Sequence, residues 1–126
     1  METTNETSHS SAIAGVQEIR VEYVDNELYI LASDGKSSSE LCHIKSGYDK
    51  DTKFTFYPPA ILGPGNYDLT FIGINWGGPY KFTLQIDDAP PFGLESPENA
   101  DSAQLRPGVV WQETISIMVT SLSRKD

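Results

Sequence analysis

Apolar and polar residues alternate along much of the chain, which is the pattern of β-strands with one buried face. Residues 27–32 differ, because they are apolar at nearly every position and predict a strand covered on both faces. No stretch keeps a helical period over any length. The strands predicted by alternation are 16–23, 41–45, 52–57, 67–74, 80–86 and 108–121.

Turn residues between these strands predict how neighbouring strands connect. Asp25-Asn26 predicts a hairpin of 16–23 with 27–32, and the turn 75–79 predicts a hairpin of 67–74 with 80–86. Residues 87–107 contain prolines, glycines and acids without a sustained period. We interpret them as a functional loop or as a loop that contains a short turn of helix.

Seven strands with regular turn signals predict one all-β domain, an antiparallel sandwich of about seven strands, with a barrel as the alternative. The polar residues 1–14 predict a disordered tail, so the sandwich domain is expected over 15–126. Segments 64–69 and 78–84 resemble the turn-plus-tyrosine entries common in immunoglobulin-like sandwiches. An immunoglobulin-like or jelly-roll-like sandwich is therefore expected, and this resemblance implies nothing about function.

The charge of the chain limits its partners. Eighteen acidic and nine basic residues give a formal charge of −9, which repels phosphate backbones and anionic membrane surfaces, so nucleic acid is excluded as the expected partner. No segment is apolar over the length of a membrane span, and no membrane insertion is expected. Cys42 is the only cysteine and no secretory signal begins the chain. These features predict a cytoplasmic protein, with non-classical release as the alternative.

The turn 75–79, Asn-Trp-Gly-Gly-Pro, is the strongest candidate for a functional site. Its glycines leave the indole uncovered, and the Asn amide offers a donor and an acceptor. Sugars present C–H faces that stack on indole and hydroxyls that pair with amides and carboxylates. The alternative is that the Trp side chain caps the core. The predicted ligand-binding residues are Asn75, Trp76, Gly77, Tyr80, Asp87 and Asp88.

Metal and catalytic motifs are weak in this sequence. Asp49 and Asp51 are the candidate oxygen ligands for calcium, but they lack the spacing of a calcium loop, and solvated turns are the favoured interpretation. Cys42 and His43 are adjacent, so on a strand they point to opposite faces and the histidine cannot activate the thiol. No phosphate-loop, nucleophile-elbow or dinucleotide motif occurs. We therefore expect a protein that is not an enzyme and has no cofactor besides calcium, if an ion binds.

Two function hypotheses follow. The first is a non-catalytic, lectin-like carbohydrate-binding module whose site is built from loops. Homo-oligomerisation would then multiply weak sites, with the final strand and its Trp111, Ile115 and Ile117 as the pairing edge. The alternative is a protein-interaction or assembly subunit, such as an accessory or toxin-associated component, that uses the same edge. The expected partner is accordingly a glycan or a protein.

Overall fold

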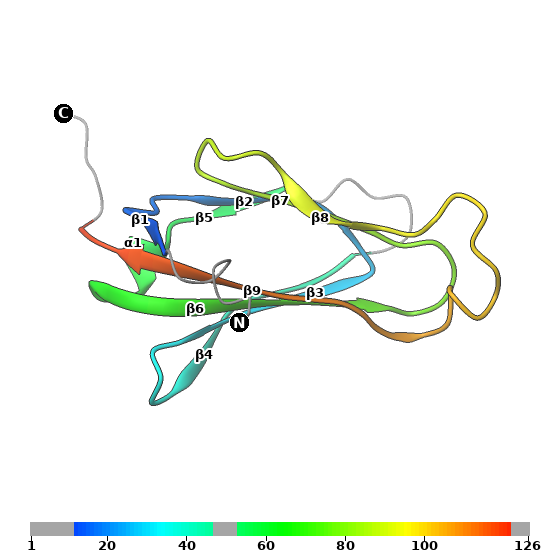
Figure 1. Cartoon of the computed structure of the whole chain (residues 1–126), viewed down its shortest axis with the longest axis horizontal. Helices are drawn as coiled ribbons and strands as arrows, with labels where there is room; N and C mark the ends of the chain where they lie inside the picture. The colour runs from blue at the N-terminus through cyan, green and yellow to red at the C-terminus, as the bar shows by residue number, and fades with distance from the viewer. Residues whose placement is uncertain (1–11, 47–52, 122–126) are drawn as a thin grey trace, which may run out of the picture.

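A computed structural model of the chain describes residues 12–46 and 53–121 as two β-sheets packed face to face (Figure 1). One sheet has five strands in the order β1-β9-β6-β3-β4, and the other has four in the order β5-β2-β7-β8. The predicted all-β sandwich is confirmed, with nine strands instead of about seven. The elements are β1 (Ile13–Ala14), β2 (Ile19–Asp25), β3 (Glu27–Ser33), β4 (Ser38–Lys45), β5 (Phe54–Phe56), α1 (Pro58–Ile61), β6 (Gly65–Asn75), β7 (Lys81–Ile86), β8 (Phe92–Glu95) and β9 (Gly108–Val119).

The core lies between the two sheets and is made by alternate residues of the long strands. Trp111 of β9 stacks against Phe71 of β6 and Phe82 of β7, with ring centroids 6.0 and 5.8 Å apart. Because these rings come from both sheets, they join the two layers directly. The inward positions predicted for β7 are confirmed, since Tyr80, Phe82, Leu84 and Ile86 are all buried.

Both predicted hairpins are wrong. β2 and β3 lie in different sheets, and so do β6 and β7. The turns at Asp25-Asn26 and at residues 76–80 carry the chain from one layer to the other, and the pairing is instead β2 with β7 and β3 with β6. Alternation identifies the buried face of a strand, but in a sandwich both layers bury the same kind of face. The pattern therefore could not separate pairing within a sheet from packing between sheets.

Other departures concern single elements. β3 was expected to be covered on both faces, but its outward residues Glu27, Tyr29 and Leu31 are only partly buried. Residues 87–107 contain a short strand, β8, which was not predicted. They also contain one helix-like turn, in which the Leu105 N–H donates to Asp101 O at 3.2 Å. Ile13–Ala14, assigned to the tail, pairs in parallel with Ile117 and Met118 of β9. No helix in the described part of the chain is long and apolar enough to cross a membrane.

The inner face of β6 leaves no room for a side chain at Gly73. A Cβ atom added there would lie 2.8 Å from two ring carbons of Phe82, which is itself buried. We expect Gly73→Ala to lower the free energy of unfolding by about 1–3 kcal/mol, because overpacking displaces a core ring. Gly63→Ala is the matched control, since an added Cβ there meets nothing within 4 Å. Urea denaturation measures both, and equal midpoints for the two variants would contradict this packing.

Candidate functional site

The side chain of Trp76 lies at the tip between β6 and β7 and is 49% exposed. Gly77 and Gly78 follow it with φ values of 129° and 86°, a conformation that glycine adopts without strain. The Trp76 backbone N–H donates to Asn26 Oδ1 at 2.8 Å, and its indole Nε1–H donates to Glu27 Oε1 at 3.0 Å. The first bond fixes the Trp76 backbone, and the second holds the ring on the outward side of the five-stranded sheet, so the alternative that the ring caps the core is not observed.

Glu27 is the centre of this arrangement. Its side chain is 12% exposed, and Oε2 accepts a hydrogen bond from His43 Nε2–H at 2.7 Å while Oε1 accepts the indole N–H. The hydrogen bond from His43, and then that from Trp76, hold the pKa of the Glu27 carboxyl below its usual value. Glu27 is therefore a carboxylate at neutral pH, and both of its oxygens position an aromatic ring.

Tyr29 and His43 complete the group, which we call the Trp76 cluster: Glu27, Tyr29, His43 and Trp76. The rings of Tyr29 and His43 are stacked, with centroids 4.0 Å apart and planes 11° apart, because the two residues are register partners on β3 and β4. Burial and the negative charge of Glu27 raise the pKa of the Tyr29 phenol. The cluster therefore offers aromatic faces, a carboxylate, an imidazole and a protonated hydroxyl on one sheet surface.

Acidification should release the indole. A carboxyl group with a lowered folded pKa stabilises the native contact above its unfolded pKa, and this contribution is lost as pH falls through the folded pKa. We expect Trp76 fluorescence to be constant near neutral pH and to change in the acid range below the usual carboxyl pKa, while far-ultraviolet circular dichroism still reports a folded sheet. The signal of Trp76 is obtained as the difference between wild type and Trp76→Phe. The same acid transition in Glu27→Gln would contradict the assignment.

The other residues predicted for the site lie elsewhere. Asn75 is 1% exposed, and its amide is used inside the protein. Tyr80, which directly precedes β7, is buried. Asp87 follows the opposite end of β7, where its carboxylate accepts hydrogen bonds from the backbone of Gln17 and Glu18.

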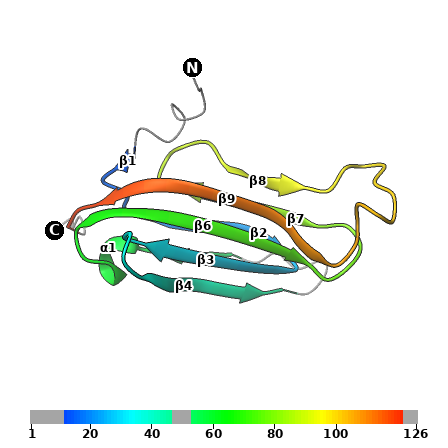
Figure 2. The same ribbon diagram turned by 60° about the horizontal axis from the view of Figure 1, so that its bottom comes forward.

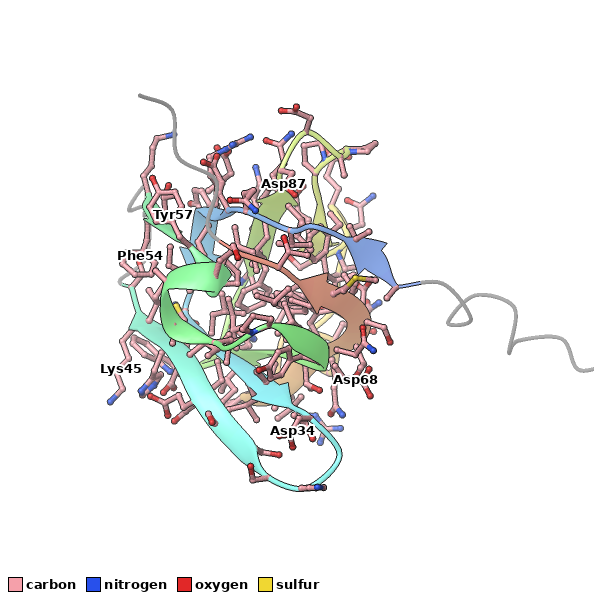
Figure 3. The ribbon with its side chains drawn as sticks, turned by 90° about the vertical axis from the view of Figure 1, so that its left-hand side faces the viewer. Asp34, Lys45, Phe54, Tyr57, Asp68 and Asp87 are labelled. Carbon is pink, nitrogen blue, oxygen red and sulfur yellow. The ribbon has the colours of Figure 1, made fainter. Side chains whose placement is uncertain are left out.

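Only Trp76 and Gly77 of the predicted set therefore stand at one surface. Asp88 is exposed beside Asp87, away from Trp76, and Asp49 and Asp51 lie outside the described residues. Within the described ranges, no three His, Cys, Asp or Glu side chains form a group that could hold a metal ion. Figure 3 shows Asp87 on the side of the four-stranded sheet, opposite Asp34 and Asp68.

Sequence reasoning missed Glu27, Tyr29 and His43. From the sequence, His43 is considered only as a partner for Cys42, and Glu27 and Tyr29 are placed in a strand covered on both faces. The sequence did indicate that His43 is on the surface, because neighbouring residues of a strand point to opposite faces. Cys42 is 6% exposed and His43 faces outward, as predicted. Burial raises the pKa of the Cys42 thiol to about 11, so this cysteine is a packing residue.

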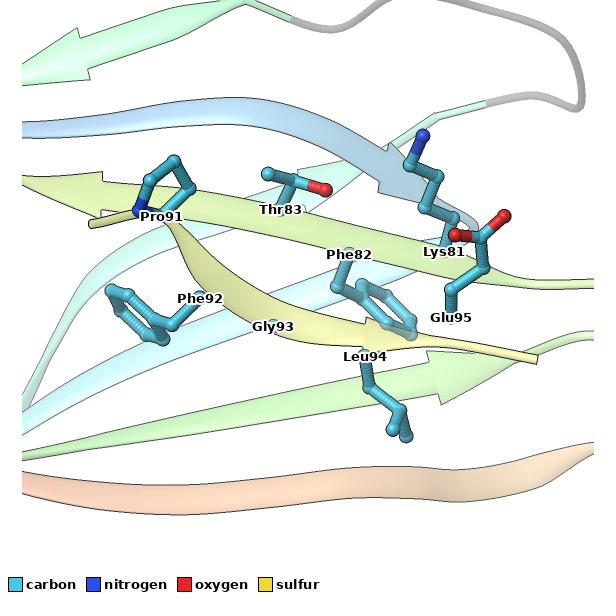
Figure 4. A pocket seen from close by; sticks show the side chains of 8 residues that line it. All are labelled: Lys81, Phe82, Thr83, Pro91, Phe92, Gly93, Leu94 and Glu95. Atoms are coloured by element: carbon cyan, nitrogen blue, oxygen red, sulfur yellow. The ribbon is translucent and has the colours of Figure 1, made fainter. Parts of the chain in front are cut away.

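Two hollows of about 350 Å³ lie away from the Trp76 cluster. One is a groove along the edge strand β8, where Figure 4 shows Phe82, Phe92 and Leu94 around Gly93. Its lining is mainly apolar, with Lys81 and Glu95 at one end. The other hollow, which we call the polar hollow, is on the five-stranded sheet and is lined by Ala12, Ser33, Asp34, Gly35, Asn66, Tyr67, Asp68, Ser116 and Ile117.

Comparison of the chain with protein-family models, with curated proteins and with solved structures finds no match in any of the three.

Proposed function

We propose that the protein is a non-catalytic, lectin-like module that binds an uncharged glycan at the Trp76 cluster. The observation that carries this proposal is the half-exposed indole of Trp76, held on the sheet by the hydrogen bond to Glu27. A fixed aromatic face loses little conformational entropy when it binds a flat apolar surface. The C–H face of a pyranose ring is such a surface.

The polar groups of the cluster supply the second half of sugar recognition. Glu27, His43 and the Tyr29 hydroxyl can accept or donate hydrogen bonds to sugar hydroxyls next to the indole. Bonds to a charged carboxylate are stronger than bonds between neutral groups. Because the chain carries a net charge of −9, an anionic glycan would be repelled.

The same geometry argues for binding without hydrolysis. Glycosidases typically use two carboxyl groups on opposite sides of the scissile bond. The Trp76 cluster has one carboxylate, and both of its oxygens already accept hydrogen bonds from Trp76 and His43.

The single, buried Cys42 supports a reducing compartment such as the cytoplasm.

A second candidate function is assembly through the edge of β9. In the described residues this edge pairs only at Ile117 and Met118, with β1, so positions 108–116 present unpaired backbone groups. Such an edge is a template for a strand from another chain. Trp111 and Ile117, which we expected to form the contact, are buried in the core, so pairing would depend on the backbone.

A glycan array tests the proposal. Labelled wild-type protein is applied to immobilised neutral and anionic glycans, with calcium and with a chelator in separate runs. We expect selective binding to uncharged glycans, and loss of signal in chelator would show that an ion takes part. No binding by protein that is folded by circular dichroism would contradict the lectin function and favour assembly. Light scattering of the same sample measures whether the chain forms oligomers.

A further inference from the structure

The polar hollow and the Trp76 cluster belong to the same sheet surface. Along β6 the outward residues run from Asp68 through Thr70 and Ile72 to Ile74, and Trp76 follows directly. Asp68 and Ile74 are six residues apart, so the two ends of this surface are separated by roughly 20 Å at the usual rise of a strand. We call this surface, from the polar hollow to Trp76, the outer face.

The hollow end of the outer face has side chains suited to hydroxyl groups. Ser33, Asp68 and Ser116 are register neighbours on β3, β6 and β9, and Ser116 Oγ donates to Asp68 Oδ1 at 2.7 Å. Asn66 and Asp34 stand beside this row and are exposed. Carboxylate, amide and hydroxyl groups together provide both donors and acceptors.

The middle of the outer face is a mixed surface of hydroxyl and apolar groups. Thr70 and Thr114 are register partners, and their hydroxyl oxygens are 3.2 Å apart. Ile72 lies two residues beyond Thr70 on β6, between its register partners Tyr29 and Gln112. Figure 2 shows the strands β9, β6, β3 and β4 from this side, with no described helix or strand across them.

We propose that the outer face binds a linear, uncharged glycan chain, with one end stacked on Trp76 and the other in the polar hollow. This inference rests on the proposed glycan-binding function and names its ligand class. A single sugar at Trp76 cannot reach the hollow, whereas several units of an extended chain can. The carboxylates of Asp34 and Asp68 both stand at the hollow end of the path, so a chain of uronic acids or sulfated sugars would meet like charge there.

Affinity as a function of chain length tests this inference. Isothermal titration calorimetry is performed with glucose, cellobiose, cellotetraose and cellohexaose, and with the matching series of N-acetylglucosamine and mannose oligomers. In the series that binds, we expect affinity to rise with length until the chain spans the face. Asp68→Asn should weaken the longest chain about tenfold, the effect of a bond to a charged group, and leave the disaccharide unchanged.

Two further variants separate a continuous path from a local effect. Thr114→Arg places a long side chain across the middle of the face and should remove the dependence on length while the disaccharide still binds. Asp88→Asn, a carboxylate away from this face, is the matched control and should behave as wild type at every length. Circular dichroism confirms that each variant is folded.

The outcomes distinguish this inference from the proposed function. Equal affinity for the disaccharide and the longest chain, or an Asp68→Asn variant that binds every length as wild type does, overturns the extended site and leaves a single-sugar lectin. An array on which only branched or terminal sugars bind would likewise overturn the extended site. No binding to any glycan overturns both, and a protein partner captured by the outer face would then be the alternative occupant.

Discussion

Trp76→Ala should lower the affinity for an uncharged oligosaccharide at least about tenfold, because it removes the aromatic face and the apolar area that the sugar would cover. The variant should remain folded, since the indole is 49% exposed and lies outside the core. Its loss also frees one oxygen of Glu27, which then binds water in place of the indole N–H. Calorimetric titration of wild type and variant with the same oligosaccharide measures the effect.

Two variants make the result specific to this ring. Trp76→Phe keeps an aromatic face but loses the hydrogen bond to Glu27, so we expect an affinity between those of wild type and Trp76→Ala. Tyr57→Ala removes another exposed aromatic side chain, 46% exposed, next to α1 and away from the outer face, and should bind as wild type. If Trp76→Ala keeps wild-type affinity, the site is not at this turn.

The largest loss of stability outside the apolar core is expected at Asn75. Its Nδ2 group donates to the carbonyl oxygens of Gly78, Leu105 and Arg106, at 3.0, 3.1 and 3.2 Å. These contacts tie the Trp76 turn to the segment before β9. Removing the donor leaves the Gly78 and Arg106 carbonyls without this bond, at about 1–3 kcal/mol for each group that stays unpaired, whereas Leu105 O still accepts from the Gly78 N–H. We expect Asn75→Ala to lower the free energy of unfolding by roughly 2–4 kcal/mol.

Asn75→Asp should lower the free energy of unfolding further than Asn75→Ala, because it places a buried negative charge against the same carbonyl oxygens. Asn66→Ala is the matched control on the same strand, where the side chain is exposed and the expected change is within about 0.5 kcal/mol. Guanidinium denaturation gives all three values. An Asn75→Ala variant as stable as the control would show that the amide does not hold the two segments together.

The fold class was predictable because the alternation in β6, β7 and β9 is strong. The buried positions Leu69 and Phe71, or Phe82 and Leu84, occur at every second residue, which requires a covered face. Strand pairing was not predictable, since the turns after β2 and β6 contain the same residue types whether a chain folds back within a sheet or crosses to another layer. Only the register of distant strands, such as β6 with β9, decides between the two.

Part of the candidate site was predictable from the sequence, and part was not. The exposure of Trp76 followed from the glycines beside it, which is local information. The role of Asn75 was misjudged although the inward parity of Leu69, Phe71 and Gly73 extends to it. Glu27 and His43 reach Trp76 through the pairing of β3 with β4 and β6, a contact between residues far apart in sequence. Such contacts leave no signal in one sequence.

The most direct test of the proposed site is a nitrogen–proton correlation spectrum that compares its two indole N–H signals before and after an uncharged oligosaccharide is added. Trp76 and Trp111 are the only tryptophans, and Trp111 is 7% exposed in the core, so it serves as an internal control. Trp76→Phe assigns the signals. We predict that the Trp76 signal shifts with a saturable titration while that of Trp111 stays in place. A saturable titration that moves backbone signals elsewhere but leaves the Trp76 indole unchanged would contradict glycan binding at this cluster.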